Sequence, residues 1–197
     1  MLNGSDQEAV LWLQFKEGSR EAFAAIYQLH GESLIAYGLR LCPDRDLLKD
    51  QVQELFVELW HSRKNLSPTD NIKFYLFKAL RFRLMRASKR RLSVVIFPQW
   101  TDHFDGPSPD GPVEESIIER ESQESRRILL KKSLARLTPR QQEAIQLRFY
   151  QGFTQAQVAA LMEMNYQSVS NLIYQGLCRL KEFMTPAAIS LLLFFFC

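Results

Sequence analysis

The chain has 197 residues, of which 46% are hydrophobic and 24% charged, and its formal net charge is +3. This balance argues against a disordered chain, a collagen-like chain and a polytopic membrane protein, and it allows one or two globular cores. The cysteines (Cys42, Cys178 and Cys197) are odd in number and widely spaced, so they predict neither a disulfide framework nor a four-cysteine zinc site. We therefore expect a reducing compartment, the cytoplasm. The first 30 residues contain no long apolar run after a basic start, so a secretory signal is not predicted.

The net charge resolves into four blocks of alternating sign. It is −4 over residues 1–70, +8 over 71–91, −7 over 92–125 and +6 over 126–197. Two basic blocks separated by an acidic stretch suggest two contacts with a polyanion. For either block taken alone, the alternative is a solvated helix face.

Apolar side chains at helical spacing predict two helices within residues 6–41. Gly18 and Ser19 separate these helices. Ser19 is placed to cap the second helix, which Pro43 ends because proline cannot continue it.

A third helix is predicted to run from Asp44 or Asp46, either of which can cap it, to about Trp60. One side is an apolar stripe, and the opposite side carries acids and amides, namely Asp50, Gln53, Glu54 and Glu58. An apolar ridge that ends in an aromatic anchor is typical of a protein-binding face. A solvated face over a bundle core is the alternative, and composition does not separate the two.

Residues 71–91 are predicted to form a basic helix that follows a loop rich in turn residues. Its cations alternate with aromatic residues, among them Tyr75 and Phe82. Interleaved cations and rings suit single-stranded nucleic acid, because bases stack on rings while phosphates meet cations. The alternative is that the rings belong to the core. We expect core positions for Phe74, Phe77 and Leu84.

The second half of the chain begins with a proline-rich and acidic stretch, which predicts a linker over residues 92–125. A helix is predicted over 114–137, leading into a compact second domain at 126–184. The apolar tail at 185–197 is shorter than the roughly 20 residues that span a bilayer. We expect it to pack on the protein or to contact a partner, and contact with a membrane surface is the alternative.

The second domain is predicted to hold a helix-turn-helix. Thr138 and Pro139 mark one helix start, and Thr154 with Gln157 forms a capping-box pattern at the next. A tight turn at 163–165 precedes a last helix with a continuous apolar stripe. The stripe consists of Val169, Leu172, Ile173, Gly176, Leu177 and Leu180.

The other face of that last helix begins with amides, hydroxyls and a phenol. They are Gln167, Ser168, Ser170, Asn171, Tyr174 and Gln175. Such side chains at the start of a helix can read base edges, and a helix start attracts phosphate. An ordinary three-helix packing unit is the alternative, and we favour DNA readout.

Residues 22–91 and 134–183 together resemble the extracytoplasmic-function (ECF) group of bacterial RNA polymerase sigma factors, in the sigma-70 family. Residues 49–60 look like the family's core-polymerase-binding helix, 75–81 like its −10 segment, and 137–143 with the following helices like its −35 domain. The resemblance implies an all-α fold. It also implies that the chain has a sigma-2-like domain at 6–91 and a sigma-4-like domain at 126–184.

The resemblance also implies three sets of binding residues. Core polymerase is expected to meet Asp50, Gln53, Glu54, Phe56 and Trp60. The −10 element is expected to meet Tyr75, Lys78, Arg81, Phe82, Arg83, Arg86, Lys89 and Arg90. The −35 element is expected to meet Arg140, Gln167, Ser168, Ser170, Asn171, Tyr174, Gln175 and Arg179. Phe82 stands where the family usually has Asn.

By the same resemblance, the partners are core RNA polymerase, through its β′ coiled coil and β flap, promoter DNA, and an anti-sigma factor, which is often membrane-bound. Unstacked bases are expected in a pocket formed by the loop at 65–71 and the helix after it. No cofactor, metal or catalytic residue is expected, because the histidines (His30, His61 and His103) are scattered.

Three other functions remain as alternatives. The runner-up is a helix-turn-helix regulator that acts without core polymerase, and residues 138–182 alone would also suit the output domain of a response regulator. A protein-interaction module held by the apolar tail is the third. An enzyme is disfavoured for want of any site.

Overall fold

We describe a computed structural model of the chain, covering residues 4–90 and 128–183 and, for side chains, residues 7–87 and 128–183. The described residues form helices, turns and loops without a strand, which confirms the all-α prediction. The chain divides into two compact units between Pro98 and Gln99. This division falls inside the predicted linker, and the domain limits at 6–91 and 126–184 stay predictions.

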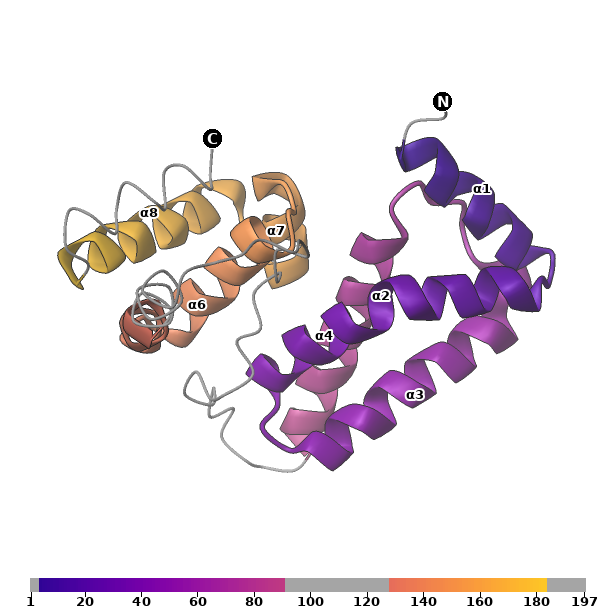
Figure 1. Cartoon of the computed structure of the whole chain (residues 1–197), viewed down its shortest axis with the longest axis horizontal. Helices are drawn as coiled ribbons and strands as arrows, with labels where there is room; N and C mark the ends of the chain where they lie inside the picture. The colour runs from indigo at the N-terminus through magenta and orange to yellow at the C-terminus, as the bar shows by residue number, and fades with distance from the viewer. Residues whose placement is uncertain (1–3, 91–127, 184–197) are drawn as a thin grey trace, which may run out of the picture. The chain divides into compact units, whose positions relative to one another are not determined.

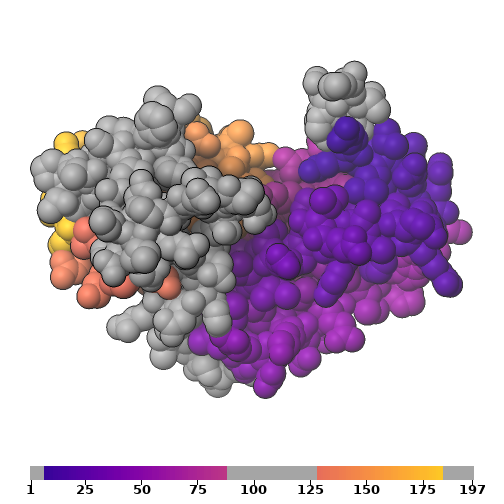
Figure 2. All heavy atoms as spheres, in the orientation of Figure 1, coloured from indigo at the N-terminus to yellow at the C-terminus, as the bar shows by residue number. Residues whose placement is uncertain are grey.

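The first unit contains four α-helices in its described part: α1 (Gly4–Lys16), α2 (Arg20–Leu41), α3 (Arg45–Ser62) and α4 (Ile72–Arg90). A short 3₁₀ turn, η1 (Arg63–Asn65), follows α3. Helix α2 packs against each of the other three, and α3 also packs against α4. Figure 1 shows α2 and α3 running side by side. On the face that Figure 2 shows, side-chain atoms of this unit fill the spaces between its helices.

The side chains that cap α2 and α3 are ones that the sequence predicts. The Ser19 hydroxyl accepts a hydrogen bond from the Ala22 amide at 3.1 Å, and Asp44, rather than Asp46, accepts one from the Leu47 amide at 3.0 Å. Each side chain satisfies a helix N–H that has no partner within the helix. The turn before α2 depends on Gly18, whose φ of +100° suits glycine.

The core of the first unit is rich in aromatic rings. Trp12 and Phe15 of α1 and Phe77 of α4 are almost completely buried. Phe77 and Leu84 therefore lie in the core as predicted, whereas Phe74 is half-buried.

The second unit is built from a helix over residues 128–135 and from α6 (Pro139–Ile145), α7 (Gln155–Met162) and α8 (Tyr166–Phe183). A π-helical turn, η2 (Gln146–Tyr150), continues α6. Only the last part of the helix predicted over 114–137 lies within the described residues. Helix α8 packs against both α6 and α7.

The start signals in this unit are those read from the sequence. Thr138 caps α6 with Pro139 in its first turn, and Thr154 forms a capping box with Gln157 at α7. The tight turn after α7 places Glu163 in the left-handed conformation, at φ 54°. The predicted helix-turn-helix is confirmed.

The apolar stripe of α8 faces the core as predicted, with Val169 and Leu180 almost fully buried. Gly176 allows close approach to α6, because a Cβ atom there would lie 2.7 Å from the Ile145 Cδ1. No helix in the described part of the chain is long and apolar enough to cross a membrane. The predicted linker at 92–125 and apolar tail at 185–197 lie outside the described residues.

Candidate functional surfaces

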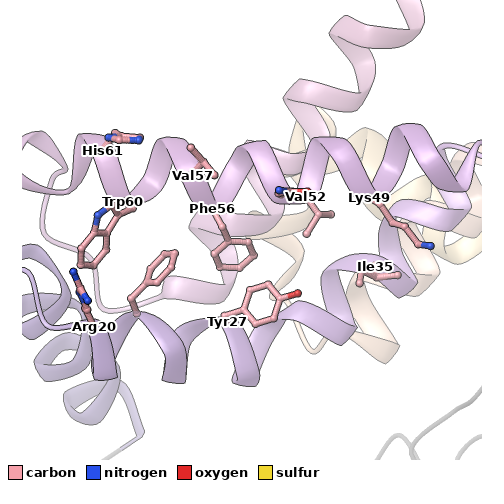
Figure 3. A pocket seen from close by; sticks show the side chains of 11 residues that line it. Arg20, Tyr27, Ile35, Lys49, Val52, Phe56, Val57, Trp60 and His61 are labelled. Atoms are coloured by element: carbon pink, nitrogen blue, oxygen red, sulfur yellow. The ribbon is translucent and has the colours of Figure 1, made fainter.

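An open groove lies between α2 and α3, and we call it the α2–α3 groove. Figure 3 shows Val52, Phe56 and Trp60 of α3 facing Tyr27 and Ile35 of α2 across it. Its remaining lining residues are Arg20, Phe23, Lys49, Gln53, Val57 and His61. The groove is mostly apolar and has polar side chains at its edges, which is the composition of a protein-docking surface.

The residues predicted to bind core polymerase divide into two kinds. Asp50, Gln53 and Glu54 are exposed on α3. Phe56 is only 4% exposed, and Trp60 is half-buried. The two rings therefore shape the groove. Gln53 is exposed and lines the groove, while Asp50 and Glu54 are exposed on α3 outside the lining.

Ring contacts explain why Phe56 and Trp60 are held in place. The Phe56 ring lies 4.9 Å from the Tyr27 ring and 6.0 Å from the Phe23 ring, measured between centroids. The Trp60 ring lies 5.2 Å from Phe23, and the Arg63 guanidinium lies 4.4 Å from the Trp60 ring. Edge-to-face packing of this kind fixes ring orientation.

A stripe of exposed side chains runs along α4. Lys78, Phe82 and Arg86 follow one another at four-residue spacing, so they share one helix face. Phe82 is 61% exposed, which is unusual for a phenylalanine. An exposed ring between two cations fits nucleic acid better than it fits a solvated face.

The other side chains predicted to meet the −10 element have different surroundings. Tyr75 is half-buried, its ring lies 5.3 Å from that of Trp12, and burial together with the nearby Glu58 carboxylate raises the pKa of its phenol. Arg81 is half-buried. Arg83 forms ion pairs with Glu54, at 3.2 Å, and with Glu58. The side chains of Lys89 and Arg90 lie outside the described residues.

A second hollow lies where the loop at 66–71 meets α1, and we call it the loop hollow. The loop lines it with Pro68, Thr69 and Asp70. Helix α1 supplies the other wall with Ala9, Trp12, Leu13 and Lys16. The predicted pocket combined the loop with the helix after it, whereas α1 lines this hollow together with the loop. The signal was Trp12, whose indole N–H needs a partner when it is buried.

The exposed face of α8 carries the amides and the phenol predicted for base readout. Gln167, Asn171, Tyr174 and Gln175 are exposed, and Ser168 and Ser170 are half-buried. The Gln167 amide donates to the Asn171 side-chain oxygen at 3.2 Å. A hydrogen bond with Cys178 raises the pKa of Tyr174.

Helix α7 fixes the start of α8 through one side chain. The Gln155 amide donates to the Ser170 hydroxyl at 2.7 Å and accepts from the Tyr166 hydroxyl at 2.9 Å. Both predicted arginines are exposed: Arg140 lies near the start of α6, and Arg179 donates to the side-chain oxygen of the buried Gln141 at 3.3 Å. Gln155 was not among the predicted residues.

The described part of the chain contains no cluster of three His, Cys, Asp or Glu side chains that could hold a metal ion.

Comparison with known proteins assigns both units. Residues 26–93 match the family model for sigma-70 region 2, and residues 127–180 match the model for sigma-70 region 4. The chain belongs to the sigma-70 family. Two curated ECF RNA polymerase sigma factors named SigK, from Mycobacterium sp. strains JLS and KMS, are each 27% identical to it over 176 residues. Each alignment covers 88% of both chains.

Solved sigma-factor structures share the fold. The sigma factor RpoE from Bartonella quintana, in complex with the anti-sigma factor NepR, gives a TM-score of 0.57 at 23% identity. That match covers 82% of this chain and 95% of RpoE. CnrH, in complex with the cytosolic domain of CnrY, gives a TM-score of 0.54 at 20% identity and covers 89% and 95%.

These matches confirm the predicted family and group. A sigma-70 family member of the ECF group is a transcription initiation factor that binds core RNA polymerase and directs it to promoters, and it is not an enzyme. The region 2 match also weighs against the alternative regulator without core polymerase, because that alternative rested on the second domain alone.

Proposed function

We propose that this sigma factor docks on core polymerase through the α2–α3 groove and the outer face of α3, and reads promoter DNA with α4 and α8. One observation carries the proposal: an open apolar groove lies beside exposed Asp50, Gln53 and Glu54 in the region 2 segment. A pair of helices can bind to such a surface by burying apolar side chains in the groove and making polar contacts at its rim.

In this proposal the β′ coiled coil of core polymerase lies along α3. Asp50, Gln53 and Glu54 make its polar contacts. Phe56 and Trp60 act by holding the shape of the groove, because the rings are packed against α1 and α2. The second unit contacts the β flap.

At the −10 element, the stripe of Lys78, Phe82 and Arg86 meets the separated strands. The cations neutralise phosphates, and the exposed Phe82 ring stacks on an unpaired base. A base that has left the stack would enter the loop hollow, which is lined by α1 and by the loop that precedes α4 in the chain. Tyr75, Arg81 and Arg83 support this face from positions that are partly buried.

At the −35 element, α8 enters the major groove with its N-terminal end. Gln167 and Asn171 offer amides to base edges, while Ser168, Ser170, Tyr174 and Gln175 extend the contact. Arg140 contacts phosphate from α6. Arg179 is held by Gln141 and contributes charge near the helix end.

We further propose that an anti-sigma factor holds this chain inactive in the cytoplasm, where core polymerase works. The structural relatives RpoE and CnrH are each bound to such a partner. The apolar α2–α3 groove is the surface that both core polymerase and an anti-sigma factor would use, so their binding would be mutually exclusive.

The docking site is tested by an alanine variant on α3 and a control variant on α2 that removes the same charge. The double variant Asp50→Ala, Gln53→Ala is expected to weaken affinity for core polymerase at least tenfold, since each lost interfacial contact costs about 1 kcal/mol. The matched control is Gln28→Ala, Glu32→Ala, which removes one amide and one acid from exposed positions of α2 outside the groove. Equal affinities for wild type and the α3 variant would move the docking site elsewhere.

A further inference from the structure

Helix α1 lies ahead of the region 2 match, which begins at residue 26, so the family assignment gives it no role. Two of its side chains nevertheless converge on one place, the 66–71 loop and the first residue of α4. These side chains are Glu8 and Trp12.

Glu8 caps α4 from outside that helix. Its carboxylate accepts a hydrogen bond from the Ile72 amide at 2.8 Å, across 64 positions of sequence. The first amides of a helix have no partner within it, and a negative charge there is stabilised by the helix dipole. The local cap, Asn71, accepts a hydrogen bond from the Phe74 amide at 2.8 Å, so Glu8 and Asn71 satisfy different donors in the first turn of α4.

Trp12 holds the other end of the loop. Its side chain is 1% exposed, and its indole N–H donates to the Ser67 carbonyl at 2.9 Å. Its ring also lies 5.3 Å from Tyr75 on α4 and 5.2 Å from Phe15 on α1. The loop is therefore tied to α1 at Ser67 and again at Ile72, the residue that begins α4.

We propose that Glu8 and Trp12 are positioning residues that hold the 66–71 loop and the start of α4 in the shape needed for strand separation at the −10 element. This inference rests on the proposed function of that loop and helix. Helix α1 also forms one wall of the loop hollow, so loosening α1 would change the shape of the hollow directly. The outward polar residues of the docking site, Asp50 and Gln53, lie on α3 and make neither contact.

The test uses holoenzyme reconstituted with core polymerase, on a promoter selected by wild-type holoenzyme from a random library. Trp12→Phe keeps a ring but loses the N–H, and Glu8→Ala removes the acceptor. Glu8→Gln keeps an acceptor oxygen without the charge. Val10→Ala is the control, because Val10 lies on the same helix and is 47% exposed.

We expect Trp12→Phe and Glu8→Ala each to lower the rate constant of promoter opening about five- to tenfold, because each variant loses one hydrogen bond that positions the loop or the start of α4. The affinity of each variant for core polymerase should stay within about twofold of the wild-type value, because substitutions far from a binding site change its affinity little. Glu8→Gln should recover most of the opening rate, and Val10→Ala should match wild type.

A merely structural role gives a different result. Loss of folded protein reduces the fraction of complexes that open, but it leaves the rate constant of the remaining ones unchanged. Wild-type rate constants in both Trp12→Phe and Glu8→Ala, or a loss confined to the amplitude, would overturn the inference. If wild-type holoenzyme opens no promoter, the proposed function itself fails, and the inference fails with it.

Discussion

Arg83 of α4 reaches Glu54 of α3, and a guanidinium nitrogen lies 3.2 Å from the Glu54 carboxylate. The same guanidinium contacts Glu58 one helical turn further along α3. Arg83 was predicted to meet DNA and Glu54 to meet core polymerase, yet the two side chains also bind each other. These ion pairs tie α4, which we propose meets DNA, to α3, which we propose meets core polymerase, and they offset the charge of Arg83.

The ion pairs of Arg83 predict that it contributes less to DNA binding than its neighbour Arg86. The plot of log K against log salt has a negative slope, and each phosphate that a cation neutralises adds about 0.7 to 0.9 to its magnitude. We expect Arg86→Ala to reduce the magnitude of the slope for holoenzyme on promoter DNA by about that amount. Arg83→Ala should leave the slope nearly unchanged. A larger slope change for Arg83→Ala would mean that its ion pairs open on DNA.

Arg83→Ala should instead affect folding, and only modestly. The two glutamates are well exposed, so the pairs contribute about 0.5–1 kcal/mol to the free energy of unfolding. A double-mutant cycle of Arg83→Ala with Glu54→Ala, measured by chemical denaturation, isolates the coupling energy. A coupling energy near zero would show that the pair adds nothing to stability.

The exposed ring of Phe82 predicts a stacking role at the −10 element. Base stacking on an aromatic side chain contributes about 1–3 kcal/mol. Phe82→Ala should therefore reduce the yield of open complexes at least fivefold on a promoter where opening is incomplete, and Phe82→Trp should retain it. Leu29→Ala is a control with similar exposure on α2. Full opening by Phe82→Ala on that promoter would exclude stacking as its role.

The amides on α8 predict base discrimination at the −35 element. Asn171→Ala should relax discrimination at one base pair by about 1–3 kcal/mol, because a bidentate amide contact is lost. Arg140→Ala should weaken binding to all sequences alike, as loss of a phosphate contact does. Competition between promoters that differ only in the −35 element separates the two effects, and a uniform loss for Asn171→Ala would contradict base readout.

Buried His30 predicts that stability falls in acid. His30 is 7% exposed, and within the described residues its Nε2 has no hydrogen-bond partner. Burial and the nearby Lys73 lower its pKa, burial being the larger effect, while Glu8 opposes the shift. The unfolded chain thus binds a proton at a pH where the folded chain does not, so the free energy of unfolding falls as pH drops below about 6.5.

His30→Gln should reduce this acid sensitivity, while His61→Gln, at an exposed position of α3, should leave it unchanged. The measurement is urea denaturation between pH 7 and pH 5, followed by the fluorescence of the tryptophans, Trp12, Trp60 and Trp100. The slope can reach about 1.4 kcal/mol per pH unit for one group. The same acid sensitivity in His30→Gln would assign it to other groups.

Structural features that depend on residues close together in the chain, such as helix caps and apolar stripes, could be predicted from the sequence. The caps at Ser19 and Thr154 act over three positions, so their side chains and partners could be read together. The stripe of α8 was equally readable, because one face of a helix repeats every three or four residues.

Contacts between distant segments were not predictable. Trp12 meets Ser67 across 55 positions, and Arg83 meets Glu54 across 29. Nor does a sequence show whether a ring such as Phe56 contacts a partner directly or only supports the surface that contacts it. Rings of either kind lie on the same apolar stripe. Helix packing decides that, and here it buries Phe56 between α2 and α3.

The central claim is that this chain directs core polymerase to promoters by reading two elements. Run-off transcription with bacterial core polymerase tests it most directly, on templates selected from a random promoter library by the reconstituted holoenzyme. We predict a transcript from one start site that requires the chain and that disappears when either the −10 or the −35 element is replaced. Core polymerase that neither binds the chain nor gains a defined start site would contradict the account.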